Sequence, residues 1–468
     1  MEWHDKSIVV LGAGDTGLSV VRWAERVGAR VRVADTRAAP PGLNELRAKH
    51  PRVEFIAGTY SDALFGDAEL VVASPGVAVA GPACDPAIAR ARAQGKKFVG
   101  DVELFAWEQI ELAKKGTRPK MIGITGSNGK STVTAMAGAM CRATGMKTAV
   151  AGNIGLPVLD AMLDARDHGQ PEVYVVELSS FQLETTSSLE CDAATMLNLS
   201  QDHLDRYASM DDYTDAKRRI FLYAQHQVLN RDDAASLAMR KPETALSTFG
   251  IDVPKTPNEF GINDGWLHEG NRRLIALREM PVAGLHNAAN ALAAFALCRA
   301  ACPDADTEKL AAGLKAFKGL PHRLENVGVI DGVTFFDDSK GTNVGSTVAA
   351  LNGMTVPVVL IAGGIGKEQD FLPLAAPVKA RARSVVLIGQ DARAIEDAVA
   401  DTRVPTAHAV SMADAVAQAL AHAKPGDAVL LSPACSSFDM FKNYNHRGDV
   451  FAQCVRDLKQ QREARHAV

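Results

Sequence analysis

The glycine-rich segment at residues 126–132 constrains the fold more than any other part of the sequence. It follows the apolar run Met121–Thr125 directly and opens a stretch of helical composition. A strand, a glycine loop and a helix in this order bind anions, because backbone N–H groups and the helix N-terminus face the phosphate. The lysine can reach terminal phosphates, and a hydroxyl can bind Mg²⁺. The residues predicted to hold a nucleoside triphosphate are Gly126, Ser127, Asn128, Gly129, Lys130, Ser131 and Thr132.

This loop is shorter than the usual Walker pattern, since Ile124 stands where that pattern has its first glycine. Elsewhere, short β-branched runs alternate with alanine-rich helical stretches, which is typical of parallel sheets covered by helices. We therefore predict the α/β class. A length of 468 residues exceeds what one hydrophobic core serves. Glycine and proline breaks divide the chain into three expected domains, at residues 1–100, 101–319 and 320–468.

The β-branched runs give the expected strands of each domain. In the first domain these are Ser7–Leu11, Ala29–Ala34, Val53–Ile56, Glu69–Ala73 and Lys97–Val99. In the second they are Lys120–Thr125, Thr148–Ala151, Val173–Glu177, Ala194–Asn198 and Gln227–Asn230. In the third they are Val333–Asp337, Val356–Ala362, Ser384–Ile388 and Ala428–Leu431. Helices are expected at Val102–Lys114, Asp211–Leu222, His286–Ala301 and Thr307–Phe317, while Pro254–Gly270 is expected to form hairpins or a surface excursion.

Composition excludes several classes of protein. The net charge is −4 and no long basic tract is present, so we expect no nucleic-acid partner. No apolar run reaches the roughly 20 residues of a membrane span, and the N-terminus lacks the pattern of a signal peptide. The seven cysteines are scattered, and Cys298 and Cys302 share helical spacing that indicates packing rather than a metal site. We expect a soluble, cytoplasmic monomer.

A second glycine loop lies near the N-terminus. Gly12, Gly14 and Gly17 follow an expected strand, and Asp35 ends the next one, as in the dinucleotide fingerprint. The spacing alone would favour NAD. The same geometry serves any nucleotide diphosphate, however, and Asp15 places a negative charge inside the loop. A tight turn without a ligand is the third alternative.

A third glycine loop, residues 363–367, follows the run Val356–Ala362 and ends in Lys367. It could bind a second phosphate, or it could offer a cation to the carboxylate of a smaller substrate. A plain turn with a solvated lysine remains the alternative.

Acidic and basic side chains follow the strands of the middle domain. Glu177 ends the apolar run VYVVE, and ligands of open α/β sheets bind at the carboxyl ends of strands. Next to a phosphate loop, this carboxylate is a candidate Mg²⁺ ligand, although strand-end glutamates are often surface residues. Asp202, His203 and Asp205 follow a later strand, and Lys217 lies on an expected helix. His203 alone could equally be an ordinary loop residue.

Long segments of the chain resemble the Mur ligases, the ATP-dependent enzymes that add amino acids to the peptidoglycan precursor. These segments are DTRAAPPGL, ASPGVA, ITGSNGKSTVT, AGNIGLP, ELSSFQLETTSSL, DHLDRY, AKRRIF, GLHNAANAL, GLPHRLE, DDSKGTNVGST and SPACSSFDMFKNY. The resemblance implies a Rossmann-like UDP-binding domain, a central ATPase domain and a C-terminal Rossmann-like domain. Within the family it points to members that join D-glutamate to UDP-N-acetylmuramoyl-L-alanine through an acyl phosphate.

The resemblance also implies roles for individual residues. Those around the UDP-linked substrate are Thr16, Asp35, Thr36, Arg37, Ser74, Gly76 and Asn153. Those near adenine, the γ-phosphate and the ribose are Asn287, Asn290, Arg323 and Asp338. Those around the incoming glutamate are Lys340, Thr342, Lys367, Ser437, Phe438 and Tyr444. The implied ligands of two Mg²⁺ ions are Ser131, Glu177, His203 and Lys217, and the implied catalytic set is Lys130, Glu177, His203 and Lys217.

Lys217 matches the family lysine that CO₂ converts to a carbamate, whose oxygens suit a hard cation as an ammonium could not. Two positions depart from the expected family pattern, Gly341 for an alanine and Phe438 for a leucine, and both concern the glutamate pocket. An NAD-dependent oxidoreductase would leave the central phosphate loop unexplained. A non-catalytic nucleotide-sugar sensor would leave Glu177, His203 and Lys217 without a role.

Overall fold

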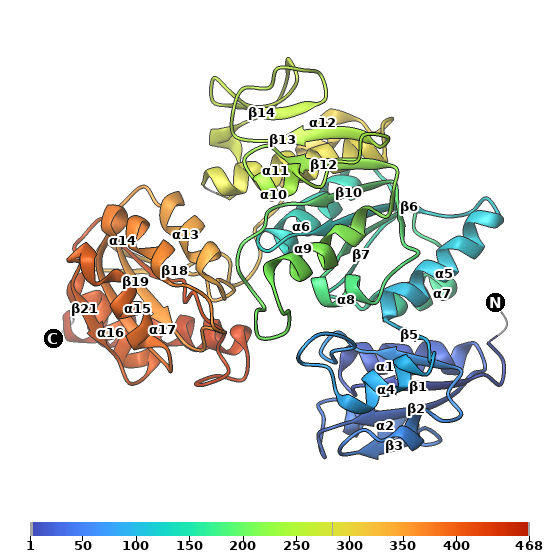
Figure 1. The fold of residues 1–468 in the computed structure, drawn as a ribbon. Coiled ribbons are helices and arrows are strands. Elements are labelled where there is room, and N and C mark those ends of the chain that lie inside the picture. Colours follow the sequence, from blue (N-terminus) through green and yellow to red (C-terminus); the bar gives the residue numbers. More distant parts are fainter. Residues whose placement is uncertain (1–2, 283, 467–468) are drawn as a thin grey trace. The chain divides into compact units, whose positions relative to one another are not determined.

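Three α/β domains follow one another along the chain (Figure 1). The computed structural model describes residues 3–282 and 284–466. Each domain is built on its own largely parallel sheet, with helices in the connections between strands. The predicted class and three-domain architecture are therefore confirmed. Among the helices of these described residues, none has both the length and the apolar character needed to cross a membrane.

The N-terminal domain has a five-stranded sheet of order β3-β2-β1-β4-β5, in which every pair is parallel. All five predicted strands are present. They are β1 Ser7–Leu11, β2 Arg30–Asp35, β3 Glu54–Ala57, β4 Leu70–Ala73 and β5 Phe98–Val99. The helices are α1 Asp15–Arg26, α2 Leu43–Lys49, α3 Asp62–Phe65 and α4 Pro86–Ala93.

The central domain has a nine-stranded sheet of order β16-β15-β14-β13-β12-β10-β6-β8-β7. Its predicted strands are β6 Lys120–Thr125, β7 Thr148–Gly152, β8 Val173–Glu177, β10 Ala193–Met196 and β12 His226–Asn230. The hairpin alternative for Pro254–Gly270 is confirmed, because antiparallel strands extend the sheet there. These strands are β14 Glu259–Asn263, β15 Trp266–Glu269 and β16 Arg272–Ala276. The sequence analysis missed β13 Ala245–Phe249 and the short pair β9 Glu190–Cys191 and β11 Tyr223–Ala224.

Helices of this domain flank the strands that carry the glycine loop. They are α5 Asp101–Lys114, α6 Lys130–Ala143, α7 Val158–His168, α8 Ser180–Glu184, α9 Met210–Arg218, α10 Ala234–Leu237, α11 Leu285–Ala301 and α12 Thr307–Lys315. The helix predicted over Asp211–Leu222 changes to a 3₁₀ turn, η1 Arg219–Phe221, after α9, and a second turn is η2 Leu277–Glu279. Cys298 packs in α11 with its sulfur 3.6 Å from that of Cys141.

The C-terminal domain has a six-stranded sheet of order β17-β18-β22-β19-β20-β21, parallel except at the β17 edge. Its strands are β17 Glu325–Ile330, β18 Val333–Asp337, β19 Val358–Gly363, β20 Ala382–Ile388, β21 Thr406–His408 and β22 Ala428–Leu431. The two edge strands, β17 and β21, were not predicted. The helices and turns are α13 Val344–Gly353, η3 Leu372–Leu374, α14 Ala375–Arg381, α15 Ala392–Val399, η4 Ala400–Thr402, α16 Met412–His422 and α17 Tyr444–His466.

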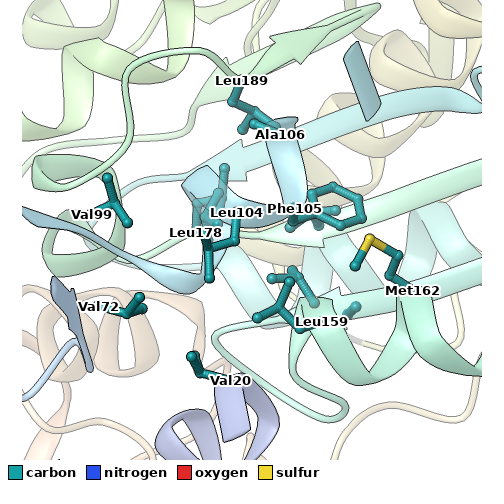
Figure 2. Packing of buried hydrophobic residues seen from close by; sticks show 14 of the residues in the cluster. Val20, Val72, Val99, Leu104, Phe105, Ala106, Leu159, Met162, Leu178 and Leu189 are labelled. Carbon is teal, nitrogen blue, oxygen red and sulfur yellow. The ribbon is translucent and has the colours of Figure 1, made fainter. Parts of the chain in front are cut away.

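The N-terminal and central domains share one hydrophobic core. Figure 2 shows Val20, Val72 and Val99 in the same cluster as residues of the central domain such as Phe105 and Leu159. By compactness the chain divides into two units rather than three. Unit 1 holds both of these domains, with the chain up to Leu199, Arg206–Met280 and Ala289–Phe317. Unit 2 holds Ser200–Asp205, Pro281–Ala288 and the chain from Lys318 onward.

Candidate active site

The central glycine loop adopts a backbone that only glycine accepts readily. Gly126 has φ +149° and Gly129 has φ +82°, and Gly129 is the N-cap of α6. A Cβ on Gly129 would lie 2.6 Å from Oδ1 of Asn290, and one on Gly126 would lie 3.0 Å from Cβ of Leu197. The loop therefore needs glycine for both backbone conformation and space.

The side chains of the loop gather at the start of α6. Lys130 donates to the carbonyl oxygens of Gly126 and Ser127, both at 2.9 Å, so its ammonium lies over the loop. Ser131 and Thr132 are buried in the first turn of the helix. This is the strand, loop and helix arrangement predicted for a phosphate site.

Two residues that the sequence analysis missed hold the loop in place. Asn198 accepts from the Asn128 amide at 2.8 Å and donates to its carbonyl at 3.1 Å. The Tyr213 hydroxyl lies 3.1 Å from Oγ of Ser127. The position of Asn198, at the end of a strand beside the loop, was the one signal available. Nothing local in the sequence marks Tyr213, because its role depends on how α9 packs.

Glu177 ends β8 in the position predicted for a metal ligand. It is 1% exposed, and its Oε1 accepts a hydrogen bond of 2.8 Å from Nδ2 of Asn153. Its Oε2 is also buried, and no described group is hydrogen bonded to it. A buried carboxylate oxygen without a partner is unfavourable unless a cation or donor binds there. The residue therefore fits a divalent cation at the carboxyl end of the sheet.

Lys217 lies at the same loop. Its side chain is buried, its Nζ donates to the Gly126 carbonyl at 2.8 Å, and the same nitrogen lies 4.6 Å from the centre of the Tyr213 ring. Lys217 lies on α9 and the glycine loop follows β6, and the two are in direct contact. Only the tertiary structure joins these two segments, which are 91 residues apart.

The predicted ligand His203 belongs to unit 2, unlike Ser131, Glu177 and Lys217. It has a left-handed backbone with φ +60°. Within unit 2, its neighbour Asp202 accepts from Nδ2 of Asn343 at 3.2 Å and lies 3.3 Å from the ammonium of Lys367.

The adenine candidates divide in the same way. Asn290 lies in unit 1 beside the glycine loop, while Asn287 lies in unit 2.

In unit 2, the predicted ribose-binding residue Asp338 has a strongly raised pKa. Burial raises its pKa to about 7, against the opposing effect of a hydrogen bond from Ser432, whose Oγ lies 2.7 Å from Oδ2. A Cβ on Gly341 would lie 2.8 Å from both Asp338 Oδ2 and Ser432 Oγ. Gly341, which stands where the family pattern has alanine, therefore leaves room for the hydrogen bond between Asp338 and Ser432.

A histidine–aspartate pair flanks Arg323 and Asp338. His322 Nδ1 lies 2.7 Å from Oδ2 of Asp337, and the His322 amide donates to Glu325 at 2.9 Å. His322 and Leu324 have φ +59° and φ +50°, values that non-glycine residues seldom adopt. These contacts fix the strained turn that carries Arg323.

The predicted glutamate-binding residues form two groups within unit 2. The Lys340 ammonium lies 3.7 Å from the centre of the Tyr444 ring, and Thr342 donates its amide to the Lys340 carbonyl at 2.9 Å. The Lys367 loop pairs with the segment before Ser437, since the Ile365 amide donates to the Ser436 carbonyl at 3.0 Å.

Phe438 follows Ser437 and is 70% exposed. This phenylalanine, which replaces the leucine of the family pattern, therefore lies on the surface of unit 2. Arg447, also missed, is buried and donates to Ser339 and to the Cys435 carbonyl, and burial lowers its pKa to about 10.

All seven residues predicted for the UDP-linked substrate line one cavity of about 450 Å³ in unit 1. Two of the fingerprint glycines, Gly12 and Gly14, also line it. Gly12 has φ +93°, and a Cβ on Gly17 would lie 1.9 Å from the Gly12 carbonyl oxygen, so the turn beside the cavity needs glycine. Tyr60, which the sequence analysis missed, also lines the cavity, and burial raises its pKa to about 12.

Asp35 is held rigidly at this cavity. It accepts from the Ala13 amide at 2.8 Å and from the Arg37 amide and Nε at 2.9 Å each. Burial acts to raise its pKa, but the hydrogen bonds from Arg37 and Ala13 outweigh burial and hold the pKa below its usual value. The carboxylate is therefore an anion at neutral pH.

Comparison with known proteins identifies the family. Three family models match in order: the MurD-like N-terminal domain at residues 6–100, the Mur ligase middle domain at residues 124–298, and the Mur ligase glutamate ligase domain at residues 322–435. A protein of Methylobacillus flagellatus named UDP-N-acetylmuramoylalanine--D-glutamate ligase is 53% identical over 463 residues, covering 98% of each chain. The chain belongs to the Mur ligases.

Other relatives of this Mur ligase carry the same name. The protein of Thiobacillus denitrificans is 53% identical over 472 residues, covering 99% of this chain and 98% of its own, and that of Chromobacterium violaceum is 49% identical over 461 residues, covering 98% and 99%.

Solved structures share the fold. The UDP-N-acetylmuramate-alanine ligase of Thermotoga maritima has a TM-score of 0.61 at 18% identity, covering 97% of this Mur ligase and 100% of that chain. A pseudomurein peptide ligase type C of Methanothermus fervidus also gives 0.61, at 17% identity and with the same coverage.

Proposed function

We propose that this Mur ligase joins D-glutamate to UDP-N-acetylmuramoyl-L-alanine, with cleavage of ATP to ADP and phosphate. The observation that carries the proposal is the position of Asn153. It lines the cavity of the N-terminal loop and also donates to Glu177 at the end of the phosphate-loop sheet. A nucleotide-linked substrate in that cavity would therefore contact Asn153, which is hydrogen bonded to the proposed cation ligand Glu177. The name shared by relatives at 48–53% identity supports the choice of substrate.

The cavity suits a UDP-linked sugar. Thr16 and the glycine-loop amides are proposed to bind the pyrophosphate, as backbone donors at a helix start do. The uridine would contact the other cavity residues, which are Asp35, Thr36, Arg37, Ser74 and Gly76. Asn153 would then lie at the L-alanine end.

ATP is proposed to bind at residues 126–132, with Asn287 and Asn290 at adenine, Arg323 at the γ-phosphate and Asp338 at the ribose. Ser131, Glu177, His203 and a carbamate on Lys217 would hold two Mg²⁺ ions, which supply positive charge for phosphoryl transfer. The buried free oxygen of Glu177 supports this assignment. An unmodified Lys217 would bring a second cation to the same place, whereas a carbamate would bring anionic oxygens.

The reaction needs two steps because a carboxylate is a poor electrophile. The L-alanine carboxylate attacks the γ-phosphorus of ATP, ADP leaves, and an acyl phosphate forms. The amine of D-glutamate then attacks the acyl carbon, and the tetrahedral intermediate expels phosphate to leave an amide. Lys130 and Arg323 would neutralise charge as the two anions approach in the first step.

The glutamate is proposed to bind in unit 2, where cationic Lys340 and Lys367 suit its carboxylates. The surrounding residues would be Thr342, Ser437, Phe438 and Tyr444. We also propose that the enzyme acts as a monomer in the cytoplasm, where ATP is available.

Product analysis tests the function against its alternatives. The purified chain should release ADP only when ATP, Mg²⁺, UDP-N-acetylmuramoyl-L-alanine and glutamate are all present, and D-glutamate should be the active enantiomer. Activity with L-glutamate alone would reassign the amino acid. Binding of the UDP substrate without turnover would support a sensor, and hydride transfer with NAD would support an oxidoreductase.

A further inference from the structure

Arg206 is a buried cation that neither the phosphate site nor the cavity lining includes. It belongs to the DHLDRY segment and lies in unit 1. Its side chain is 9% exposed. A guanidinium at this depth needs partners, because an unpaired buried charge is strongly destabilising. Its partners show what it stabilises.

The guanidinium of Arg206 joins the N-terminal domain to the central domain at the substrate cavity. Nη1 donates to the Pro75 carbonyl at 2.7 Å, and Nη2 is 3.3 Å from the Val77 carbonyl. Nη2 also donates to Oε1 of Glu184 at 2.6 Å, and the group stacks 4.2 Å from the centre of the Phe181 ring. One side chain thus contacts both the N-terminal and the central domain.

The two carbonyls belong to a loop of the cavity. Ser74, Pro75, Gly76 and Val77 all line it. The C=O and N–H groups of a trans peptide unit point in opposite directions, so a Pro75 carbonyl held by Arg206 turns the Gly76 N–H away from Arg206. Within the described part of the chain, no group accepts a hydrogen bond from that N–H. The Gly76 N–H therefore points away from the guanidinium, on an exposed residue that lines the cavity.

Glu184 and its surroundings complete the arrangement. Oε2 of Glu184 accepts from the Tyr207 hydroxyl at 3.1 Å, so both oxygens of the carboxylate are bonded. Glu184 lies on α8, the helix that also carries Gln182, another residue of the cavity lining. The Arg206–Glu184 pair is thus anchored to the central domain on one side and to the cavity loop on the other.

We propose that Arg206 is a positioning residue for the UDP-linked substrate, acting through the loop Ser74–Val77. This inference rests on the proposed function, since it takes the cavity to be the site of that substrate. Arg206 sets the orientation of the Gly76 peptide unit and the height of the loop above α8. Its loss weakens binding of the UDP-linked substrate and leaves ATP binding unchanged.

A matched control exists in the same unit. Arg22 of α1 also joins the N-terminal domain to the central domain, donating to Asp160 of α7 at 2.8 Å and 2.6 Å. Neither residue lines the cavity. Replacing Arg22, whose side chain is 31% exposed, removes another interdomain ion pair but leaves the loop at Pro75 untouched.

The test compares Arg206→Met, Arg206→Lys and Arg22→Met in the full chain by steady-state kinetics. Loss of hydrogen bonds to a charged group is expected to raise the KM for UDP-N-acetylmuramoyl-L-alanine about tenfold in Arg206→Met. The KM for ATP should change less than about twofold, and Arg206→Lys should recover part of the loss because it keeps one donor and the charge. Arg22→Met should leave all KM values near those of the wild type.

An unchanged KM for the UDP substrate in folded Arg206→Met would overturn the inference, as would an equal rise in Arg22→Met or in the KM for ATP. If Arg206→Met does not fold, Glu184→Gln decides. It weakens the anchor of Arg206 and should raise the same KM about threefold, and an unchanged value overturns the inference. A wild-type chain that neither binds nor uses the UDP substrate would refute the proposed function itself, which the variants alone cannot do.

Discussion

The side-chain amide of Asn153 donates to Glu177 Oε1 at 2.8 Å, and the other oxygen of that buried carboxylate has no hydrogen-bond partner among the described residues. The backbone repeats the contact, because the Asn153 amide donates to the Glu177 carbonyl at 2.8 Å. One oxygen is thus fixed by a residue that lines the N-terminal cavity, while the other is the oxygen that we propose as a cation ligand. This relationship orients the carboxylate before any ligand arrives, which favours binding.

Removal of the Lys130 charge should abolish ligation. Lys130→Ala keeps the loop amides but loses the cation that stabilises phosphoryl transfer, so kcat should fall by at least about 10³-fold. Initial rates of ADP release measure the effect, with circular dichroism to verify the fold. The exposed lysine Lys114 offers a control, and Lys114→Ala should keep normal activity. Turnover near that of the wild type in folded Lys130→Ala would rule out the ATP site proposed here.

A carbamate on Lys217 predicts chemical rescue. Lys217→Ala should lose most activity, because an anionic oxygen ligand disappears from the cation site. Acetate can fill the vacated space and should restore part of the rate, measured as kcat against acetate concentration. The same acetate should not restore Lys130→Ala, which lacks a cation instead. Full activity of Lys217→Ala without acetate would contradict the carbamate.

Asp338 predicts a loss of stability as pH rises. Its folded pKa of about 7 lies above the ordinary value of 3.8, so the folded chain holds this proton more tightly than the unfolded chain. The resulting stabilisation is complete below pH about 4 and falls away up to pH about 7, by at most about 4 kcal/mol. In thermal unfolding, the wild type should therefore lose stability relative to Asp338→Asn as the pH rises from about 4 to about 7.

Asp427 provides the opposite case. A hydrogen bond from Arg383 lowers the pKa of its carboxyl below 3.8, so its stabilisation is present above that value and lost only in acid. The difference between wild type and Asp427→Asn should stay constant from pH 5 to pH 8. A pH-independent difference for Asp338→Asn as well would mean that the Asp338 pKa is not raised.

The shared core of unit 1 predicts unequal effects for two phenylalanines. Phe105 is fully buried within this core (Figure 2). Its ring centre lies 5.2 Å from that of Tyr174 in an edge-to-face arrangement. Phe105→Ala should cost about 3–5 kcal/mol through the cavity it leaves. Phe438 is 70% exposed, so Phe438→Ala should leave the melting temperature unchanged and alter only the KM for glutamate. Differential scanning calorimetry measures the first effect, and equal melting temperatures for the two variants would contradict it.

Local pattern determined much of this protein. The run Met121–Thr125 followed by a glycine loop predicted the strand, loop and helix that the structure has, an arrangement typical of phosphate sites. The strand at Val173–Glu177 was equally clear, since a continuous apolar run of that length is buried on both faces of a parallel sheet. Domain order and the α/β class follow from the same local signals.

Strands of mixed composition were among the elements that the sequence pattern missed. β17 and β21 lie at the two edges of the C-terminal sheet, where a strand is paired on one side only and needs less apolar surface. β13 lies inside the central sheet, between β12 and β14, and its run ALSTF mixes polar and apolar residues.

Tertiary structure alone decided which distant residues meet. Lys217 reaches the carbonyl of Gly126, Tyr213 reaches Ser127, and Arg206 reaches the loop at Pro75, although nothing near these residues in the sequence indicates such partners. It also decided that the N-terminal and central domains share one core, while His203 belongs with the C-terminal domain. The reason is physical. Periodicity and turn chemistry act over a few residues, whereas burial and hydrogen bonding pair groups that only the packed chain brings within reach.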